Sequence, residues 1–480
     1  MSVPPIISPA VPDFDPGFDP GSNPGFDPGP SINRRIFRAA AIVTLAGVLV
    51  KIVATVKEFF VADAFGRSDA MDAYLIAFLV PGLLVNLFSE SMNQALIPTL
   101  VRVRESEGLR KAQELLSSAM LWTCGVLAAG SVLMGLAARL FFPLVASHFP
   151  PEKLLLTEHL FYGLLPVVLL TGVASNCSSV LNTFERFAWP ALAPMATPLA
   201  VILGAWLLAP RWGIWALVDS NVAGSLVWAL LMVWMMQTHG YRFHLKWYGG
   251  GPSTGTKPAI WEVAGQYGPI LLSGLVASSG LLVDQGMAAT LPSGSVSTLV
   301  YANRFVSVVL NLLAGSIATA VTPYFSQLVA RRDWVACRHT LNTYVRLTAL
   351  ISIPVAVVMI LGSHLLIRLT FQHGAFGPTD TAAVAPVQAM YAIQLPFYIV
   401  SRVFYRFLVA IRRTSLILTC GVINLVLDVV LNIILMRWYG VAGIALATSL
   451  WTVSTFIFLC YWTYRLLPRG PEPATEGVEQ

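Results

Sequence analysis

Long apolar segments separated by short polar loops run along nearly the whole chain. A helix needs about 20 mostly apolar residues to cross a hydrocarbon core of about 30 Å, and about twelve segments meet that length. The pattern therefore predicts an all-α polytopic membrane protein. The predicted spans are 36–65, 71–99, 113–142, 153–184, 188–209, 213–237, 260–290, 296–328, 341–370, 381–411, 414–436 and 441–464.

The composition leaves little room for a domain outside the membrane. Hydrophobic residues make up 56% of the chain and charged residues 11%, and the mean hydropathy is +0.71, whereas soluble proteins average about 25% charged residues. We therefore expect no soluble catalytic domain and no enzyme activity. The five cysteines lie singly, without the paired spacing of a metal site, so we expect no metal and no cofactor.

The two ends of the chain differ from the spans. Residues 1–35 contain three copies of Phe-Asp-Pro-Gly and are too rich in Pro and Gly to build a helix. We predict a disordered cytoplasmic tail there and a second, short tail at 466–480. The start of the chain has no basic region followed by an apolar one, so it does not resemble a cleaved signal peptide.

The loop charges predict the orientation in the membrane. Cytoplasmic loops of membrane proteins carry an excess of Lys and Arg. Twenty of the 30 Lys and Arg residues fall in loops on one side of the predicted spans and six on the other. This asymmetry places both termini in the cytoplasm, and it explains the net charge of +6 without a nucleic-acid partner.

An internal repeat divides the spans into two halves. At an offset of 226 residues, Arg211-Trp212 corresponds to Arg437-Trp438, and each pair lies in the same kind of loop. Residues 36–238 and 259–465 are then two six-helix bundles of the same topology, joined by a cytoplasmic linker at 239–258. Parallel repeats of this kind are related by a pseudo-two-fold axis along the membrane normal, with the substrate site between them.

Charged residues inside the predicted spans are the main candidates for that site. Lys51, Lys57 and Glu58 lie in the first span, Asp284 in the seventh and Arg304 in the eighth. Lys57, Asp284 and Arg304 lie about 9–12 Å inside the outer ends of their spans, and Lys51 lies near the middle of its span. An ionised side chain at the bilayer centre costs about 2.5–3.5 kcal/mol, so such charges normally face a polar cavity.

Two interpretations of these charges stay open. The three basic side chains, from opposite halves, can converge on an anion such as a pyrophosphate, Arg304 through a planar bidentate contact and the lysines as mobile point charges. Alternatively, the charges neutralise one another across helices and only hold the bundles together. A direct pair between Lys51 and Glu58 would have to bridge about 10 Å along the helix axis, whereas Lys57 and Glu58 should point in different directions.

Other polar residues of the second span are secondary candidates. Asp72 begins this span, where a carboxylate either caps the exposed backbone N–H groups of its own helix or contributes to substrate binding. Near the inner end of the span, Glu90, Asn93 and Gln94 either line an inner vestibule or form hydrogen bonds between helices.

Several ordered stretches resemble one known family. VKEFFVADAFG, MDAYLIAFLVP and LFSESMNQALIP, within residues 51–98, are similar to the first two spans of the MurJ/MviN-type lipid II flippases of the MOP superfamily. The segments 178–204 and 293–328, and QHGAFGPTDTA with YGVAGIALATSL, also resemble this family. The resemblance implies a MurJ/MATE-like fold, and it implies that Lys51, Lys57 and Arg304 bind a lipid-linked pyrophosphate.

The chain departs from the family pattern in two places. Family members commonly carry two arginines in the second span, within a pattern like LLRRLFAEG, where residues 83–91 of this chain read LLVNLFSES. Family members also continue with a further pair of helices that is associated with a groove for the lipid tail. We therefore expect a shortened variant of about twelve spans, and an exopolysaccharide repeat unit joins lipid II as a candidate cargo.

Together these observations predict an alternating-access flippase in the bacterial cytoplasmic membrane, with a polyprenyl-pyrophosphate-linked saccharide as substrate and membrane lipid as surroundings. We expect a monomer whose transport is driven by the membrane potential, at about 2.3 kcal/mol per charge and 100 mV, or is coupled to Na⁺ or H⁺. A cation-coupled multidrug exporter of the same superfamily is one alternative, and it should carry carboxylates rather than lysines in its first half. A polytopic membrane enzyme acting on lipid-linked sugars is the other, and it should carry a catalytic carboxylate or His in a large outer loop.

Overall fold

The computed structural model describes residues 30–183, 187–238, 265, 274 and 278–467. These ranges are helices joined by short loops, and no strand lies in them. This confirms the predicted all-α class. The first group of helices comprises α1 (Pro30–Phe65), α2 (Asp69–Glu107), α3 (Leu109–Val145), α4 (Pro151–Thr183), α5 (Ala188–Leu192), the 3-10 turn η1 (Ala193–Met195), α6 (Ala196–Leu207), α7 (Ala209–Trp212) and α8 (Trp215–Thr238). The second group comprises the helical residues 278–288, α10 (Ser295–Ala330), α11 (Trp334–Leu361), α12 (Ser363–Phe371), α13 (Pro378–Ala392), α14 (Gln394–Ala410), α15 (Thr414–Tyr439) and α16 (Val441–Leu466).

Parts of the predicted organisation lie outside the described residues. These parts are the linker at 239–258 and most of the tails at 1–35 and 466–480. Helix α1 begins at Pro30, earlier than the predicted start at residue 36. Proline suits the first turn of a helix, because the N–H that it lacks would have no partner there.

Nine stretches of the described chain are long and apolar enough to cross a membrane. They are α3, α4, the run from α5 to α6, α8, α10, α11, the run from α13 to α14, α15 and α16. Helices α1 and α2 and the helical residues 278–288 lie in the three remaining predicted spans, and most of the first part of the span predicted at 260–290 lies outside the described residues.

Caps and prolines explain where several helices begin and break. Ser68 accepts a hydrogen bond from the backbone N–H of Met71 at the start of α2, and Asp333 does the same for Ala336 at the start of α11. Such caps satisfy backbone donors that a helix leaves unpaired. The fifth span breaks between α5 and α6 at a 3-10 turn that contains Pro194, because proline removes a backbone donor.

The two groups of helices pack in the same way. In the first group α4 contacts α2 and α8, and α8 contacts α6; in the second, α14 contacts α10 and α16, and α16 contacts α15. Gly213, before α8, and Gly440, before α16, share a φ of 55°, a conformation that glycine adopts without steric cost. The packing is therefore the one that the internal repeat predicts.

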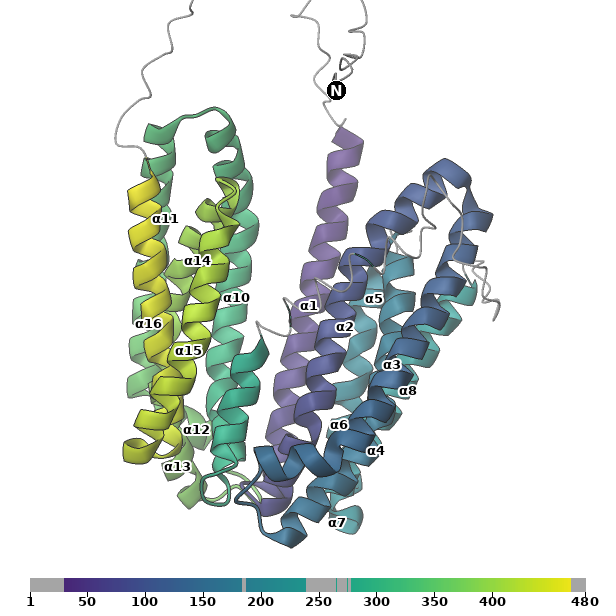
Figure 1. The fold of residues 1–480 in the computed structure, drawn as a ribbon, viewed down its shortest axis with the longest axis vertical. Helices are drawn as coiled ribbons and strands as arrows, with labels where there is room; N and C mark the ends of the chain where they lie inside the picture. The colour runs from purple at the N-terminus through teal and green to yellow at the C-terminus, as the bar shows by residue number, and fades with distance from the viewer. Residues whose placement is uncertain (1–29, 184–186, 239–264, 266–273, 275–277, 468–480) are drawn as a thin grey trace, which may run out of the picture.

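The two bundles converge at one end of the molecule and diverge toward the other (Figure 1). We call the end where α1 begins the open end. The opposite end, formed by α12, α13 and the loops before α2 and α10, is the closed end (Figure 1).

Polar contacts join the bundles at the closed end. Arg67 Nη1 lies 3.4 Å from Asp380 Oδ1, and Arg67 Nε donates to Thr298 Oγ1 at 2.6 Å. The backbone N–H of Ala375 donates to the carbonyl of Asp63 at 2.7 Å. These polar contacts lie beside apolar contacts between the bundles, such as that between the rings of Phe59 and Phe371, whose centroids are 5.4 Å apart.

Gly224 of α8 packs directly on α6, and we expect a larger residue there to destabilise the first bundle. A Cβ at this position would lie 2.6 Å from Thr197 Cα and 2.9 Å from Ala200 Cβ. Gly224→Ala should lower the free energy of unfolding by about 1–3 kcal/mol, measured as a lower melting temperature in detergent. Gly125→Ala is the control, because a Cβ there meets no atom within 4 Å. Equal melting temperatures for the two variants would contradict this packing.

Candidate functional site

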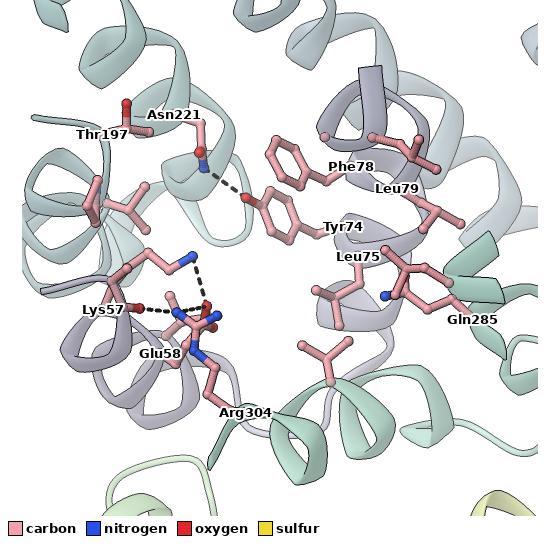
Figure 2. Close-up of a pocket in the computed structure, with 18 of the residues that line it drawn as sticks. Lys57, Glu58, Tyr74, Leu75, Phe78, Leu79, Thr197, Asn221, Gln285 and Arg304 are labelled. Carbon is pink, nitrogen blue, oxygen red and sulfur yellow. Dashed lines mark hydrogen bonds and ion pairs between the residues drawn. The ribbon is translucent and has the colours of Figure 1, made fainter. Parts of the chain in front are cut away.

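A cavity of about 500 Å³ lies between the two bundles, near the closed end (Figure 2). Side chains from α1, α2, α6, α8, residues 278–288 and α10 line it. Its volume is within the range of about 300–1,000 Å³ that is typical of small-molecule sites. Both bundles therefore contribute to one site, as the repeat predicts.

A charged cluster of three residues, Lys57, Glu58 and Arg304, forms one wall of the cavity (Figure 2). Lys57 Nζ lies 3.0 Å from Glu58 Oε1, and Arg304 Nη2 lies 3.6 Å from the same oxygen. Arg304 Nη2 also donates to the carbonyl of Ala54 at 2.6 Å. One buried carboxylate on α1 therefore bridges two cations that come from opposite bundles.

The charged cluster keeps one net positive charge and an unused donor. Two cations face one carboxylate, and the Nε–H of Arg304 is buried without a hydrogen-bond partner in the described part of the chain. A buried donor without a partner costs about 1–3 kcal/mol, so an anion that reached it would be stabilised. The side chains of Lys57 and Arg304 are 27% and 29% exposed, so both are accessible from the cavity.

The structure brings Lys57, Glu58 and Arg304 together in an arrangement that differs from the expected one. Neighbours on a helix differ by about 100° in direction, and we expected Lys57 and Glu58 to point apart. Their long side chains nevertheless reach one point, so that expectation was wrong. Glu58 neutralises one of the two positive charges, so the other is left for a ligand.

Lys51 does not join the charged cluster. It lies about 9 Å closer to the open end than Lys57, measured along the axis of α1. Its side chain is exposed and is not part of the cavity lining, although the neighbouring Val50 is. The predicted convergence is therefore wrong for Lys51, and its contact with a substrate stays a prediction.

Asp72 lies outside the cavity and connects the two bundles at the closed end. Its buried carboxylate accepts hydrogen bonds from the backbone N–H groups of Gly294 (2.7 Å) and Ser297 (2.9 Å), at the start of α10, and Lys153 Nζ lies 3.2 Å away. Asp72 therefore caps a helix of the opposite bundle, whereas Ser68 caps its own. The predicted cap is correct in kind but was assigned to the wrong helix.

Sequence reasoning missed Asp69 and Lys153, which support Asp72. Lys153 Nζ lies 2.5 Å from Asp69 Oδ1, and Asp69 also accepts a hydrogen bond from Ser293 Oγ at 2.7 Å. The hydrogen bonds from Lys153 and Ser293 hold the pKa of Asp69 below its usual value. In the sequence, Lys153 looks like an ordinary outer-loop cation, and only the acidic pair near the start of the second span hints at a partner.

Asp284 lies inside the second bundle and not on the cavity wall. Its Oδ1 accepts a hydrogen bond from Asn432 Nδ2 (2.8 Å) and its Oδ2 one from Thr448 Oγ1 (3.3 Å). Asn432 Nδ2 also lies 3.2 Å from Asp428 Oδ1, so two carboxylates share one amide donor. Asp284 therefore faces α15 and α16, and its predicted place beside the basic residues was wrong.

The vestibule candidates Glu90, Asn93 and Gln94 lie in α2, on the open-end side of the cavity. Their side chains are outside the described residues. The vestibule stays a prediction.

The cavity wall across from the charged cluster was not predicted. Uncharged side chains form it: Tyr74 and Phe78 from α2, Thr197 from α6 and Asn221 from α8 (Figure 2). Asn221 Nδ2 donates to Tyr74 Oη at 2.8 Å. Single uncharged polar residues are common in membrane helices, where they form hydrogen bonds between helices, so these residues gave no distinctive signal.

This arrangement can hold an anionic group between α1 and α10. Arg304 offers a planar fork of N–H donors, and Lys57 offers a mobile ammonium group. An anion bound to both would contact both bundles at once. Among the described residues, no group of three or more His, Cys, Asp or Glu side chains could hold a metal ion.

Comparison with known proteins identifies the family. The family model described as "Lipid II flippase MurJ" matches residues 61–475. The chain is 25% identical over 432 residues to a probable lipid II flippase MurJ of Buchnera aphidicola subsp. Acyrthosiphon pisum, covering 88% of this chain and 83% of the relative. It is 25% identical over 440 residues to a probable lipid II flippase MurJ of Vibrio cholerae, covering 88% and 81%.

Solved structures agree with this result. A lipid II flippase MurJ in an inward closed conformation matches with a TM-score of 0.75 at 25% identity, over 88% of this chain and 87% of that one. An inward-facing multidrug resistance MATE family transporter of the MOP superfamily matches with a TM-score of 0.73 at 12% identity, over 89% and 97%, which shows a shared fold. The resemblance seen in the sequence is thus confirmed, and the chain belongs to the lipid II flippase MurJ family.

Proposed function

We propose that this protein is a flippase that moves a polyprenyl-pyrophosphate-linked saccharide from the inner to the outer leaflet of the bacterial cytoplasmic membrane. The observation that carries this proposal is the meeting of Lys57 and Arg304, from opposite bundles, on the wall of a cavity with a net positive charge. The relatives named lipid II flippase MurJ support a lipid-linked cargo. Lipid II and an exopolysaccharide repeat unit both belong to this class.

Glu58 acts as an exchangeable counter-ion in this mechanism. It partly neutralises Lys57 and Arg304 in apolar surroundings, where an unpaired charge is costly. A pyrophosphate oxygen would compete with Glu58 for Lys57 and would accept the buried Nε–H of Arg304. Charge-assisted hydrogen bonds of this kind are about twice as strong as neutral ones. Carboxylate and phosphate can therefore exchange without leaving either cation unpaired.

Alternating access requires the closed end to open. For cargo to leave on that side, the N–H groups of Gly294 and Ser297 must separate from Asp72, and Arg67 must separate from Asp380. The polyprenyl tail stays in lipid while the head group occupies the cavity. Because one chain forms the whole cavity, we expect the protein to work as a monomer.

The open end is proposed to face the cytoplasm, with both termini on that side. Helix α1 begins and α16 ends at the open end (Figure 1). The excess of Lys and Arg in the loops of that side supports this orientation. An anionic cargo that moves outward is then favoured by the inside-negative membrane potential.

The two alternatives are less well supported. A cation-coupled multidrug exporter should carry carboxylates alone in the first-bundle part of the cavity, whereas Lys57 lies beside Glu58 there. The likeness to the MATE family transporter, at 12% identity, concerns the fold. A membrane enzyme acting on lipid-linked sugars would differ in activity from a family described as flippases.

The carboxylate pair Asp284 and Asp428 is the proposed site of coupling to Na⁺ or H⁺. Both carboxylates accept from Nδ2 of Asn432, so the two groups are close together inside the second bundle. Two neighbouring buried carboxylates cannot both stay ionised without a neutralising cation. A proton or a sodium ion, with oxygen ligands from these side chains and Thr448, would supply that charge.

Replacing either cation of the charged cluster should abolish transport. Lys57→Gln and Arg304→Gln each remove a charge-assisted contact worth about 1.5–3 kcal/mol, which corresponds to about a 10- to 150-fold loss of affinity. We expect both variants to fail to complement a strain depleted of its flippase. Flipping of a fluorescent polyprenyl-pyrophosphate sugar in proteoliposomes measures the same loss directly.

Arg139→Gln is the matched control for the cavity variants. Arg139 pairs with Glu158 on the surface of the first bundle, and its side chain is 82% exposed. Exposed ion pairs of this kind contribute about 0–1 kcal/mol, so transport should stay at the wild-type level. Full transport by both cavity variants at normal expression would rule out the charged cluster as the cargo site.

Fusions to the C-terminus test the orientation. We expect a C-terminal green fluorescent protein to be fluorescent and a C-terminal alkaline phosphatase to be inactive, because the latter folds only outside the cytoplasm. A phosphatase inserted at Pro150, in the loop before α4, is the positive control. An active phosphatase at the C-terminus would invert the proposed direction of the cavity.

The coupling proposal predicts that the carboxylate pair controls the response to ion gradients. Wild-type transport should increase when an inward gradient of Na⁺ or H⁺ is imposed on proteoliposomes. Asp284→Asn and Asp428→Asn should abolish that increase, because a neutral amide no longer needs a cation. Asp219→Asn, at an exposed position of α8, is the control. An undiminished gradient response in both pair variants would refute the coupling.

A further inference from the structure

The cavity has two chemically different walls (Figure 2). Lys57, Glu58 and Arg304 form the charged wall. Tyr74 and Phe78 face it from α2, together with Asn221 from α8 and Thr197 from α6. A head group that fills the cavity therefore meets charge on one side and uncharged aromatic and polar groups on the other.

The uncharged wall offers hydrogen-bonding groups of both kinds. Asn221 Nδ2 uses its two protons on Tyr74 Oη and on the carbonyl of Leu217, each at 2.8 Å. The Oδ1 of Asn221 is thus left as an acceptor and the hydroxyl proton of Tyr74 as a donor. Sugar hydroxyls, which donate and accept, match such a set.

Aromatic rings give this wall a flat apolar surface beside its polar groups. The rings of Tyr74 and Phe78 are stacked, with centroids 6.1 Å apart and an interplanar angle of 8°. Sugar rings carry an apolar C–H face as well as hydroxyl groups. The combination of ring surface, donor and acceptor therefore suits a sugar better than it suits a second phosphate.

The charges around the cavity limit the cargo further. Among the described lining residues, the charged ones are Lys57, Glu58 and Arg304, with a net charge of +1. The pyrophosphate itself uses that positive charge. A carboxylate on the sugar would lie against the uncharged wall without a counter-ion, and burying an unpaired charge is strongly unfavourable.

We infer that Tyr74, Phe78, Asn221 and Thr197 form a sugar subsite that selects a cargo with an uncharged first sugar. This inference rests on the proposed function, since it assumes that the pyrophosphate binds Lys57 and Arg304. The first sugar after the pyrophosphate then lies against Tyr74 and Phe78, with its hydroxyl groups on Asn221 Oδ1 and the hydroxyl of Tyr74. Tyr74 and Asn221 determine specificity, whereas the charged cluster provides attraction for any lipid pyrophosphate.

Three lipids with one polyprenyl chain test the subsite. They are polyprenyl pyrophosphate without a sugar, with N-acetylglucosamine and with glucuronic acid. We would measure the binding of each lipid to the purified full-length protein in detergent and its flipping in proteoliposomes. The wild type should prefer the N-acetylglucosamine lipid to both others.

Variants distinguish a sugar contact from a purely structural hydrogen bond between α2 and α8. Tyr74→Phe keeps the ring and removes the hydroxyl, and Asn221→Ala removes the amide. Each should lower the ratio of N-acetylglucosamine-lipid affinity to bare-lipid affinity about three- to tenfold, the effect of one lost hydrogen bond. A structural role would change both affinities by the same factor and leave the ratio unchanged. Tyr162→Phe is the control, because it removes a hydroxyl that bonds Gly135 on the bundle surface.

The outcomes separate this inference from the proposed function. An unchanged ratio in both variants, or a wild-type preference for the glucuronic acid lipid, would overturn the subsite. Weaker binding of all three lipids by Lys57→Gln would support the pyrophosphate site independently of the subsite. Binding of none of the three lipids by the wild type would overturn the proposed function itself.

Discussion

A charge inside a membrane protein must be paired, and this requirement shapes the centre of the molecule. Glu58 lies between Lys57 and Arg304 and contacts both, so the three side chains form one electrostatic unit. Removing one member would leave the others in an unfavourable state. Because α1 supplies two members and α10 the third, the unit that would receive an anion is also a contact between the bundles.

Buried charges at the closed end are also paired, in part with backbone N–H groups. Asp72 is satisfied by backbone N–H groups at the start of α10, where the positive end of the helix dipole favours a carboxylate. Lys153 also pairs with Asp72, and Arg67 pairs with Asp380. The closed end therefore combines paired charges with apolar contacts between the bundles, such as that between Phe59 and Phe371.

Features that depend only on residues near one another in the sequence could be predicted. Span length is a local property, so the apolar segments followed from it, and the recurring Arg-Trp pair indicated the repeat. Lys57, Glu58 and Arg304 were conspicuous as charges in apolar spans. The depth of a residue in the membrane could also be counted along its helix. The direction of its side chain could not, because that depends on how the helix is rotated in its bundle, and Asp284 points away from the cavity. Tyr74 and Asn221 went unnoticed because uncharged polar residues are ordinary in spans.

Helix α2 carries both the junction at the closed end and part of the cavity wall. Asp72 and Tyr74 are two residues apart, about 3 Å along the helix axis. A shift of the first bundle that frees Asp72 from α10 must also move Tyr74 relative to Arg304, while Tyr74 keeps its hydrogen bond to Asn221 within the same bundle. The closed-end junction and the cavity wall are therefore coupled mechanically through one continuous helix.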